Sequence, residues 1–91
     1  MKIEDLLRDE ALRQREFPVT AEKVFLAHAG VSPLPRYVAE AMREYLSAAA
    51  RGDQEACFPR GRALETRKLA AELLGCTAQE IALVGPTALG L

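Results

Sequence analysis

The sequence is poor in the residues that mark several specialised classes of protein. Its 91 residues include no Trp, two Tyr, three Phe, one His and two Cys. So few aromatic side chains argue against a surface that stacks nucleic-acid bases. Lys and Arg number 12 against 13 Asp and Glu. With no excess of positive charge, binding to nucleic acid or to an anionic membrane has no electrostatic support.

Cysteine and long apolar runs are also scarce. Cys57 and Cys76 are too few for a disulfide framework, and with His28 alone their spacing fits no zinc motif. We expect both to be reduced thiols without a catalytic role, as is usual in the cytoplasm. The charged start of the chain lacks the apolar core of a secretory signal. The uncharged stretch at the end, residues 81–91, is too short to span a bilayer. The sequence therefore predicts a cytoplasmic protein that binds no metal, nucleic acid or membrane.

The residues that are abundant are those of an ordinary globular protein. Hydrophobic residues make up 49% of the chain and charged residues 27%, which is a folded rather than a disordered composition. A chain of this length forms one domain at most. It also buries only a modest share of its surface, so its stability is marginal without further contacts.

Apolar periodicity predicts a mainly α chain of about three helices with short extended segments. Residues recurring every three to four positions indicate helices, while small residues and prolines such as those of "HAGVSPLP" indicate loops. Gly52 and Gly75 are typical helix ends, and Thr77 to Glu80 fits a capping box for a single turn. We expect a helix over 3–16, an extended segment over 24–32, and helices over 34–50 and 62–75.

The last eleven residues predict a strand, a turn and a helix start. Ile81 to Val84 is a short apolar run of the kind that forms a strand buried on both faces, and 85–91 would turn and begin a helix. A single strand cannot satisfy its own ladder of hydrogen bonds. We therefore expect 1–91 to be one incomplete domain, the front of a longer protein.

Four stretches of the chain, in this order, resemble one known family. They are "REFPVTAEKVFLAHAGVSPLP" (15–35), "VAEAMREYL" (38–46), "ETRKLAAELLGC" (65–76) and "EIALVGPTALGL" (80–91). The chain is similar in these stretches to the N-terminal part of the class V aminotransferases, pyridoxal-phosphate enzymes that include cysteine desulfurases and selenocysteine lyases. The resemblance covers nearly the whole chain from Arg15 onward. It implies the N-terminal portion of an α/β fold-type I enzyme.

The resemblance also implies site residues. Gly85, Thr87 and Ala88 match the family's turn that holds the cofactor phosphate, where a helix N-terminus offers free N–H groups. Capping of the helix by Thr87 alone is the simpler alternative. Ala29 and Gly30 match small residues beside the amino-acid substrate. His28 stands where the family often has Asn or Ser, and we expect it to be structural or solvent-facing.

The catalytic groups of the family have no counterpart in this sequence. The relatives' Schiff-base lysine, pyridine-binding Asp and ring-stacking His all lie further along, and the only lysines here are Lys2, Lys23 and Lys68. The resemblance thus implies a truncated fragment of a transaminase or desulfurase, itself inactive and without bound pyridoxal phosphate. The alternative is a stand-alone helical module that self-associates as a homo-oligomer and has no catalytic activity.

Overall fold

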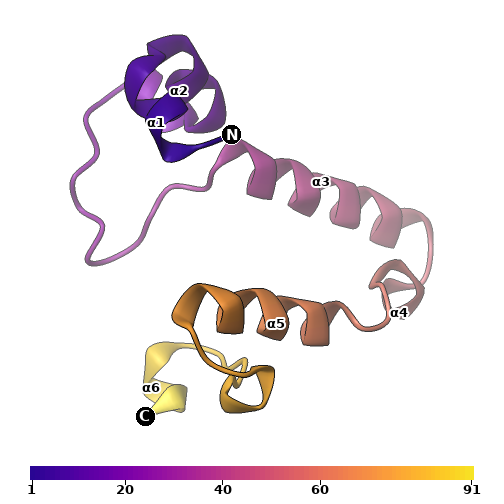
Figure 1. Cartoon of the computed structure of the whole chain (residues 1–91). Helices are drawn as coiled ribbons and strands as arrows, with labels where there is room; N and C mark the ends of the chain where they lie inside the picture. The colour runs from indigo at the N-terminus through magenta and orange to yellow at the C-terminus, as the bar shows by residue number, and fades with distance from the viewer. The chain divides into compact units, whose positions relative to one another are not determined.

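The computed structural model describes the whole chain, Met1–Leu91, and contains helices but no β-strand (Figure 1). The prediction of a mainly α chain is confirmed. The chain divides into two compact units, Met1–Gly52 and Asp53–Leu91, where the sequence led us to expect a single domain. Each unit is built from helices linked by turns and loops.

The first unit begins with two short helices in place of the single helix expected over 3–16. Helix α1 spans Ile3–Arg8 and α2 spans Glu10–Glu16, with extended backbone at Asp9 between them. The Asp9 carboxylate accepts a hydrogen bond from the backbone N–H of Leu12 at 2.9 Å. Asp competes for backbone donors and is favoured at helix starts. The prediction of an unbroken helix was wrong because this cap restarts the helix.

Loops and the longest helix complete the first unit. The 3₁₀ turn η1 spans Pro18–Ala21, and the chain is then irregular, with a turn at 28–30, up to Pro35. Helix α3 spans Arg36–Arg51 and ends at Gly52, as expected. It begins two residues later than expected, because Pro35 has ψ of 150° and stands outside the helix as its N-cap.

The second unit is built around helix α5. The short helix α4, Gln54–Cys57, is capped by the Asp53 carboxylate, which accepts from the N–H of Glu55 at 2.8 Å. Helix α5 spans Arg62–Leu74 and ends at Gly75 in the left-handed conformation, φ 71°. Glycine adopts this conformation without the steric cost that other residues meet. Its predicted role as the helix stop is confirmed.

Residues 81–84 form no strand, which corrects our expectation. The 3₁₀ turn η2, Ala78–Glu80, precedes them. The Ile81 N–H donates to the Ala78 carbonyl at 3.3 Å, and the Ile81 carbonyl accepts from Nε of Arg67 at 3.0 Å. These backbone groups are thus occupied within the unit, and no neighbouring strand is present to pair with the rest. Helix α6, Thr87–Gly90, follows the bend at Gly85.

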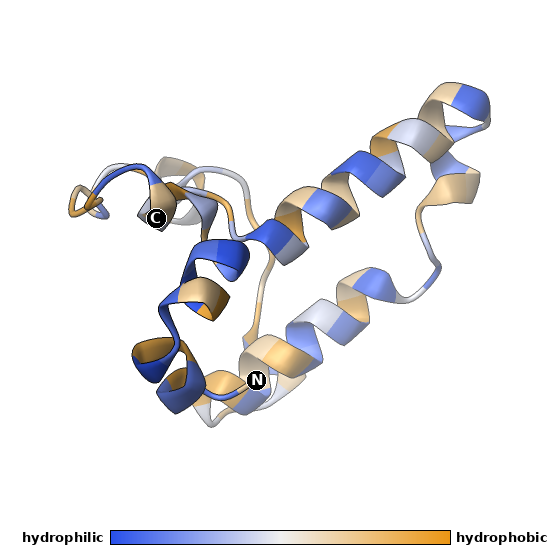
Figure 2. Cartoon of the chain, turned by 90° about the horizontal axis from the view of Figure 1, so that it is seen from above, coloured by the Kyte–Doolittle hydropathy of each residue, from blue (hydrophilic) through white to orange (hydrophobic).

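The helices leave most of their apolar faces uncovered. Only Glu16 and Ala71 are buried, whereas Leu46 is 63% and Leu73 is 86% exposed. Figure 2 shows hydrophobic and hydrophilic residues alternating along α3 and α5. On α5 the face that carries residues 63, 66, 70, 73 and 74 is not the one that the chain buries. Burial falls instead at Ala71, on the side that packs against η2.

Candidate functional site

The terminal bend holds the residues predicted to bind a phosphate. Thr87 and Ala88 are the first two residues of α6, and the N–H of Leu89 donates to the Pro86 carbonyl at 2.8 Å. A Cβ at Gly85 would lie 3.2 Å from Cδ1 of Leu89. The open side of this glycine is therefore filled by a side chain of the same turn. Because Leu89 is 75% exposed and Cδ1 is the end of its side chain, a small shift would make room for a Cβ, so packing does not require glycine at position 85.

The bend supplies only part of what pyridoxal phosphate requires. The hydroxyl of Thr87 and the N–H groups of a helix start are suitable donors for a phosphate. The three lysines, however, lie on the N-cap of α1, after η1 and within α5, so none follows the bend along the chain. The residues of this chain therefore do not fit the whole cofactor.

The residues predicted to lie beside the substrate belong to the other unit. Ala29 and Gly30 form the exposed turn at 28–30, and a Cβ at Gly30 would meet nothing within 4 Å. His28 is also exposed, with Nδ1 3.3 Å from the Ser32 hydroxyl and its ring edge-on to Phe25 at 5.0 Å. These contacts are local and agree with the structural, solvent-facing role expected of His28.

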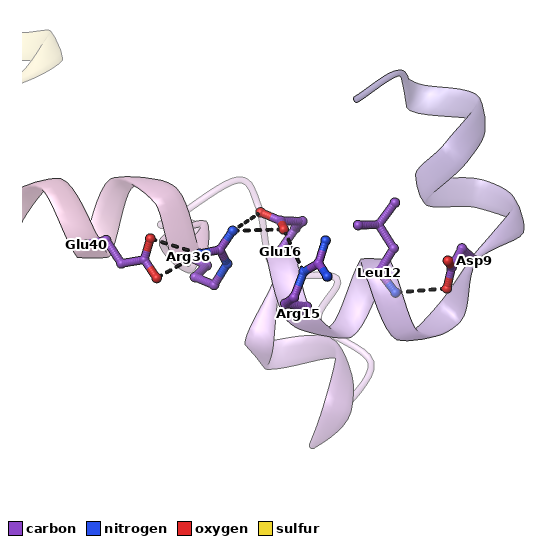
Figure 3. Close-up of polar contacts among 6 residues, drawn as sticks. All are labelled: Asp9, Leu12, Arg15, Glu16, Arg36 and Glu40. Atoms are coloured by element: carbon purple, nitrogen blue, oxygen red, sulfur yellow. Dashed lines mark hydrogen bonds and ion pairs between the residues drawn. The ribbon is translucent and has the colours of Figure 1, made fainter.

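The most organised polar group of the chain is the Arg36 cluster, formed by Arg15, Glu16, Arg36 and Glu40 (Figure 3). The Arg36 guanidinium lies between two carboxylates. Nη1 donates to both oxygens of Glu40 at 2.8 and 2.9 Å. Nη2 donates to both oxygens of Glu16 at 3.0 and 3.1 Å. The pair with Glu16 joins the end of α2 to the start of α3.

The charges of the Arg36 cluster balance one another. The hydrogen bond from Arg36, and then that from Arg15, lowers the pKa of Glu16. The pKa of Arg36 is raised, chiefly by its hydrogen bond to Glu16. Two cations face two carboxylates, so the cluster carries no excess charge to attract an ionic ligand. Its geometry is that of a structural link, in which the charge-assisted pair of Arg36 with Glu16 joins α2 to α3 and the pair with Glu40 lies within α3.

Sequence reasoning did not find this cluster. The spacing of four between Arg36 and Glu40 is a helical ion-pair signal that is readable from the sequence. Glu16, the buried member, lies 20 residues from Arg36. No local pattern connects residues so far apart across a loop.

The cysteines and acidic residues form no further site. Cys57 is half-buried and Cys76 is exposed, and both are free thiols. No group of three or more His, Cys, Asp or Glu side chains lies close enough together to hold a metal ion. None of the helices is both long and apolar enough to cross a membrane.

Comparison with known protein families, with curated proteins and with solved structures gave no match to this chain.

Proposed function

We propose that this chain is the N-terminal part of a pyridoxal-phosphate enzyme of the class V aminotransferase type. In this proposal it supplies framework helices and one phosphate-contacting turn, while residues outside these 91 carry out the chemistry on an amino-acid substrate. Transamination and cysteine desulfuration are both compatible with this role. The proposal is supported by the order of the four resembling stretches and by the character of α3.

The distribution of polar residues on α3 is the observation that carries the proposal. At 100° per residue, its polar side chains fall within one strip of roughly 100°. The strip consists of Arg36, Glu40, Arg43, Glu44, Ser47 and Arg51. The remaining circumference is apolar, and Met42 and Leu46 on it are 50% and 63% exposed. A helix with one narrow polar strip is suited to burial on more than one side, as in a large domain.

The terminal residues give secondary support. Exposed apolar side chains at Leu83 and Val84 lead through the bend at Gly85 into a helix start at Thr87. An extended segment followed by a turn and a helix is the local geometry of a phosphate-binding strand end. In the proposed enzyme, neighbouring strands would pair with 81–84, and the donors at Thr87 and Ala88 would contact the phosphate.

The test is the intact mass and the near-ultraviolet and visible absorbance of the native protein purified from its source. We expect a mass several times 9.9 kDa together with the absorbance band of a lysine-bound pyridoxal phosphate. Borohydride reduction, which fixes the cofactor to its lysine, should then locate that lysine outside residues 1–91. A covalent mass of 9.9 kDa without such a band would overturn the proposal.

A second candidate function, a self-associating helical module, is favoured by the exposed area. The chain exposes 8106 Å². Two separate globules that together have the mass of 9.9 kDa would expose roughly 6,300 Å² in total. The excess is larger than the roughly 800 Å² per partner that a stable interface buries. In this alternative, copies of the chain would cover the faces of α3 and α5.

A further inference from the structure

The elements of the first unit surround a surface cavity of about 540 Å³ that is open to solvent on one side, where Leu7 is 72% exposed. Its walls come from α1, from the end of α2, from η1 and from the loop that leads to Pro35. The volume lies within the range of small-molecule sites, which is roughly 300–1,000 Å³. The cavity lies wholly within residues 1–52 and is separate from the terminal bend of the proposed cofactor turn.

The lining of the cavity is mainly apolar. Leu6 and Leu7 contribute from α1, and Phe17 and Phe25 from either side of η1. Leu6, Phe17 and Phe25 are half-buried, so their side chains are already partly withdrawn from water. A ligand with an apolar body would complete their burial, and the removal of this apolar surface from water would favour binding.

One charged group lies in this apolar lining. Arg13 is the only charged side chain among the lining residues. Its Nη1 donates to the Leu6 carbonyl at 3.3 Å, and none of the ion pairs of the chain includes it. The other polar side chains have local partners: the Thr20 hydroxyl donates to the Phe17 carbonyl at 2.9 Å, and His28 lies against Ser32. The remaining N–H groups of Arg13 and Nε2 of His28 have no hydrogen-bond partner within the chain, and of these two side chains Arg13 is the one that always carries a positive charge.

We propose that this cavity binds a small apolar molecule that carries a single carboxylate. The carboxylate would pair with Arg13, because a guanidinium binds carboxylate oxygens in a bidentate fashion. The apolar body would lie among the leucines and phenylalanines. A cationic ligand would find no carboxylate among the lining residues. A dianionic ligand would have one charge paired with Arg13 and its second charge unpaired in apolar surroundings. The proposal is independent of the proposed enzyme function and concerns different residues.

The test is a titration of the full ¹⁵N-labelled chain with octanoate, with 2-naphthoate and with octan-1-ol, followed by NMR. We expect octanoate to shift the amide signals of the cavity residues until the site is saturated. A comparison of the affinities of octanoate and 2-naphthoate then shows whether the cavity prefers an acyl chain or an aromatic body. Arg13→Gln should weaken carboxylate binding roughly tenfold, the effect of losing one charge-assisted hydrogen bond. It should leave octan-1-ol binding nearly unchanged. Arg60→Gln, in the other unit, is the matched control and should bind octanoate like the native chain.

A second variant keeps the proposal testable if Arg13→Gln does not fold. Leu7→Asp places a negative charge on the apolar wall at a position that is 72% exposed, where the fold tolerates it, and should weaken all three ligands. Saturable binding equal to that of the native chain in either variant would overturn the proposal. The proposal would also fail if the ligand-induced shifts spread over α3 and α5 without reaching saturation. Such shifts would indicate that the ligands adsorb to any exposed apolar surface. Concentration-dependent shifts of cavity residues without ligand would overturn it too, by showing that a second copy fills the site.

Discussion

At the scale of single residues, Glu16 stands out as a nearly buried carboxylate that links two helices. It is 8% exposed and accepts hydrogen bonds from Arg36 and Arg15. Because these donors favour the ionised form, the pKa of Glu16 lies below its ordinary value of 4.5. A depressed pKa in the folded state makes folding more favourable above the unfolded pKa. That contribution is lost as the pH falls through the folded pKa.

We therefore expect acid to release α2 from α3 only below the ordinary pKa of 4.5. A ¹³C carboxyl NMR titration of Glu16, followed alongside the side-chain N–H signals of Arg36, measures this directly. Both sets of signals should change together, since the proton that neutralises Glu16 also ends its pairing with Arg36. Glu16→Gln should remove the part of the Arg36 signal change that coincides with the titration of Glu16, while the pair of Arg36 with Glu40 remains. If these signals titrate identically in the variant, another group controls the contact.

At the scale of elements, Arg67 connects α5 to the turn that follows it. Its Nε donates to the carbonyls of Ala78 and Ile81 at 3.2 and 3.0 Å, and Nη2 donates to Ala78 at 2.8 Å. At the start of this turn, the Glu80 carboxylate accepts from the N–H and the hydroxyl of Thr77 at 2.8 and 3.0 Å. The backbone hydrogen bond from Thr77 is the main cause of the lowered pKa of Glu80. One side chain and one cap thus define the path of the chain from α5 to Ile81.

Arg67→Met should loosen η2 while leaving α5 helical. Methionine keeps much of the apolar stem but removes the donors to Ala78 and Ile81, a loss of about 1–2 kcal/mol. We expect amide hydrogen exchange at Ile81 to become roughly tenfold faster. Arg62→Gln is the matched control on the same helix, because it breaks only the exposed pair with Glu65, which contributes little. Equal acceleration in both variants would show that Arg67 has no special role in the turn.

At the scale of the whole molecule, exposed apolar surface is the dominant property. Large hydrophobic side chains of every long helix lie in solvent, among them Met42, Leu46, Leu69 and Leu73. Apolar patches larger than those of ordinary monomers mark surfaces that bind other protein. Both functions proposed above would cover this surface, and they differ in whether the covering surface belongs to the same polypeptide or to another copy.

If this chain is studied alone, we expect it to self-associate through the apolar arc of α3, which is the part of its circumference outside the polar strip. Leu46→Lys, within that arc, should shift sedimentation velocity profiles toward the monomer at every protein concentration. Ser47→Lys, within the polar strip of the same helix, introduces the same charge and should leave the profile unchanged. A sharply melting monomer for the native chain would count against self-association and against the module as its function.

Local signals predicted much of the secondary structure. The start of α5 at Arg62, its end at Gly75 and the turn capped by Thr77 and Glu80 were all expected. The break at Asp9 was missed, although an aspartate three residues before Leu12 is itself an N-cap signal. The strand over 81–84 was predicted wrongly because an apolar run indicates a strand only where a neighbour can pair with it.

The sequence by itself determined where helices begin and end and which faces are apolar, because caps and periodicity act between residues a few positions apart. The tertiary structure alone decided which distant groups meet. Glu16 and Arg36 are 20 residues apart, and Arg67 and Ile81 are 14 apart. It also decided that Arg13 lines an apolar cavity. Such contacts depend on how loops return the chain upon itself, and loop paths leave no periodic trace in the sequence.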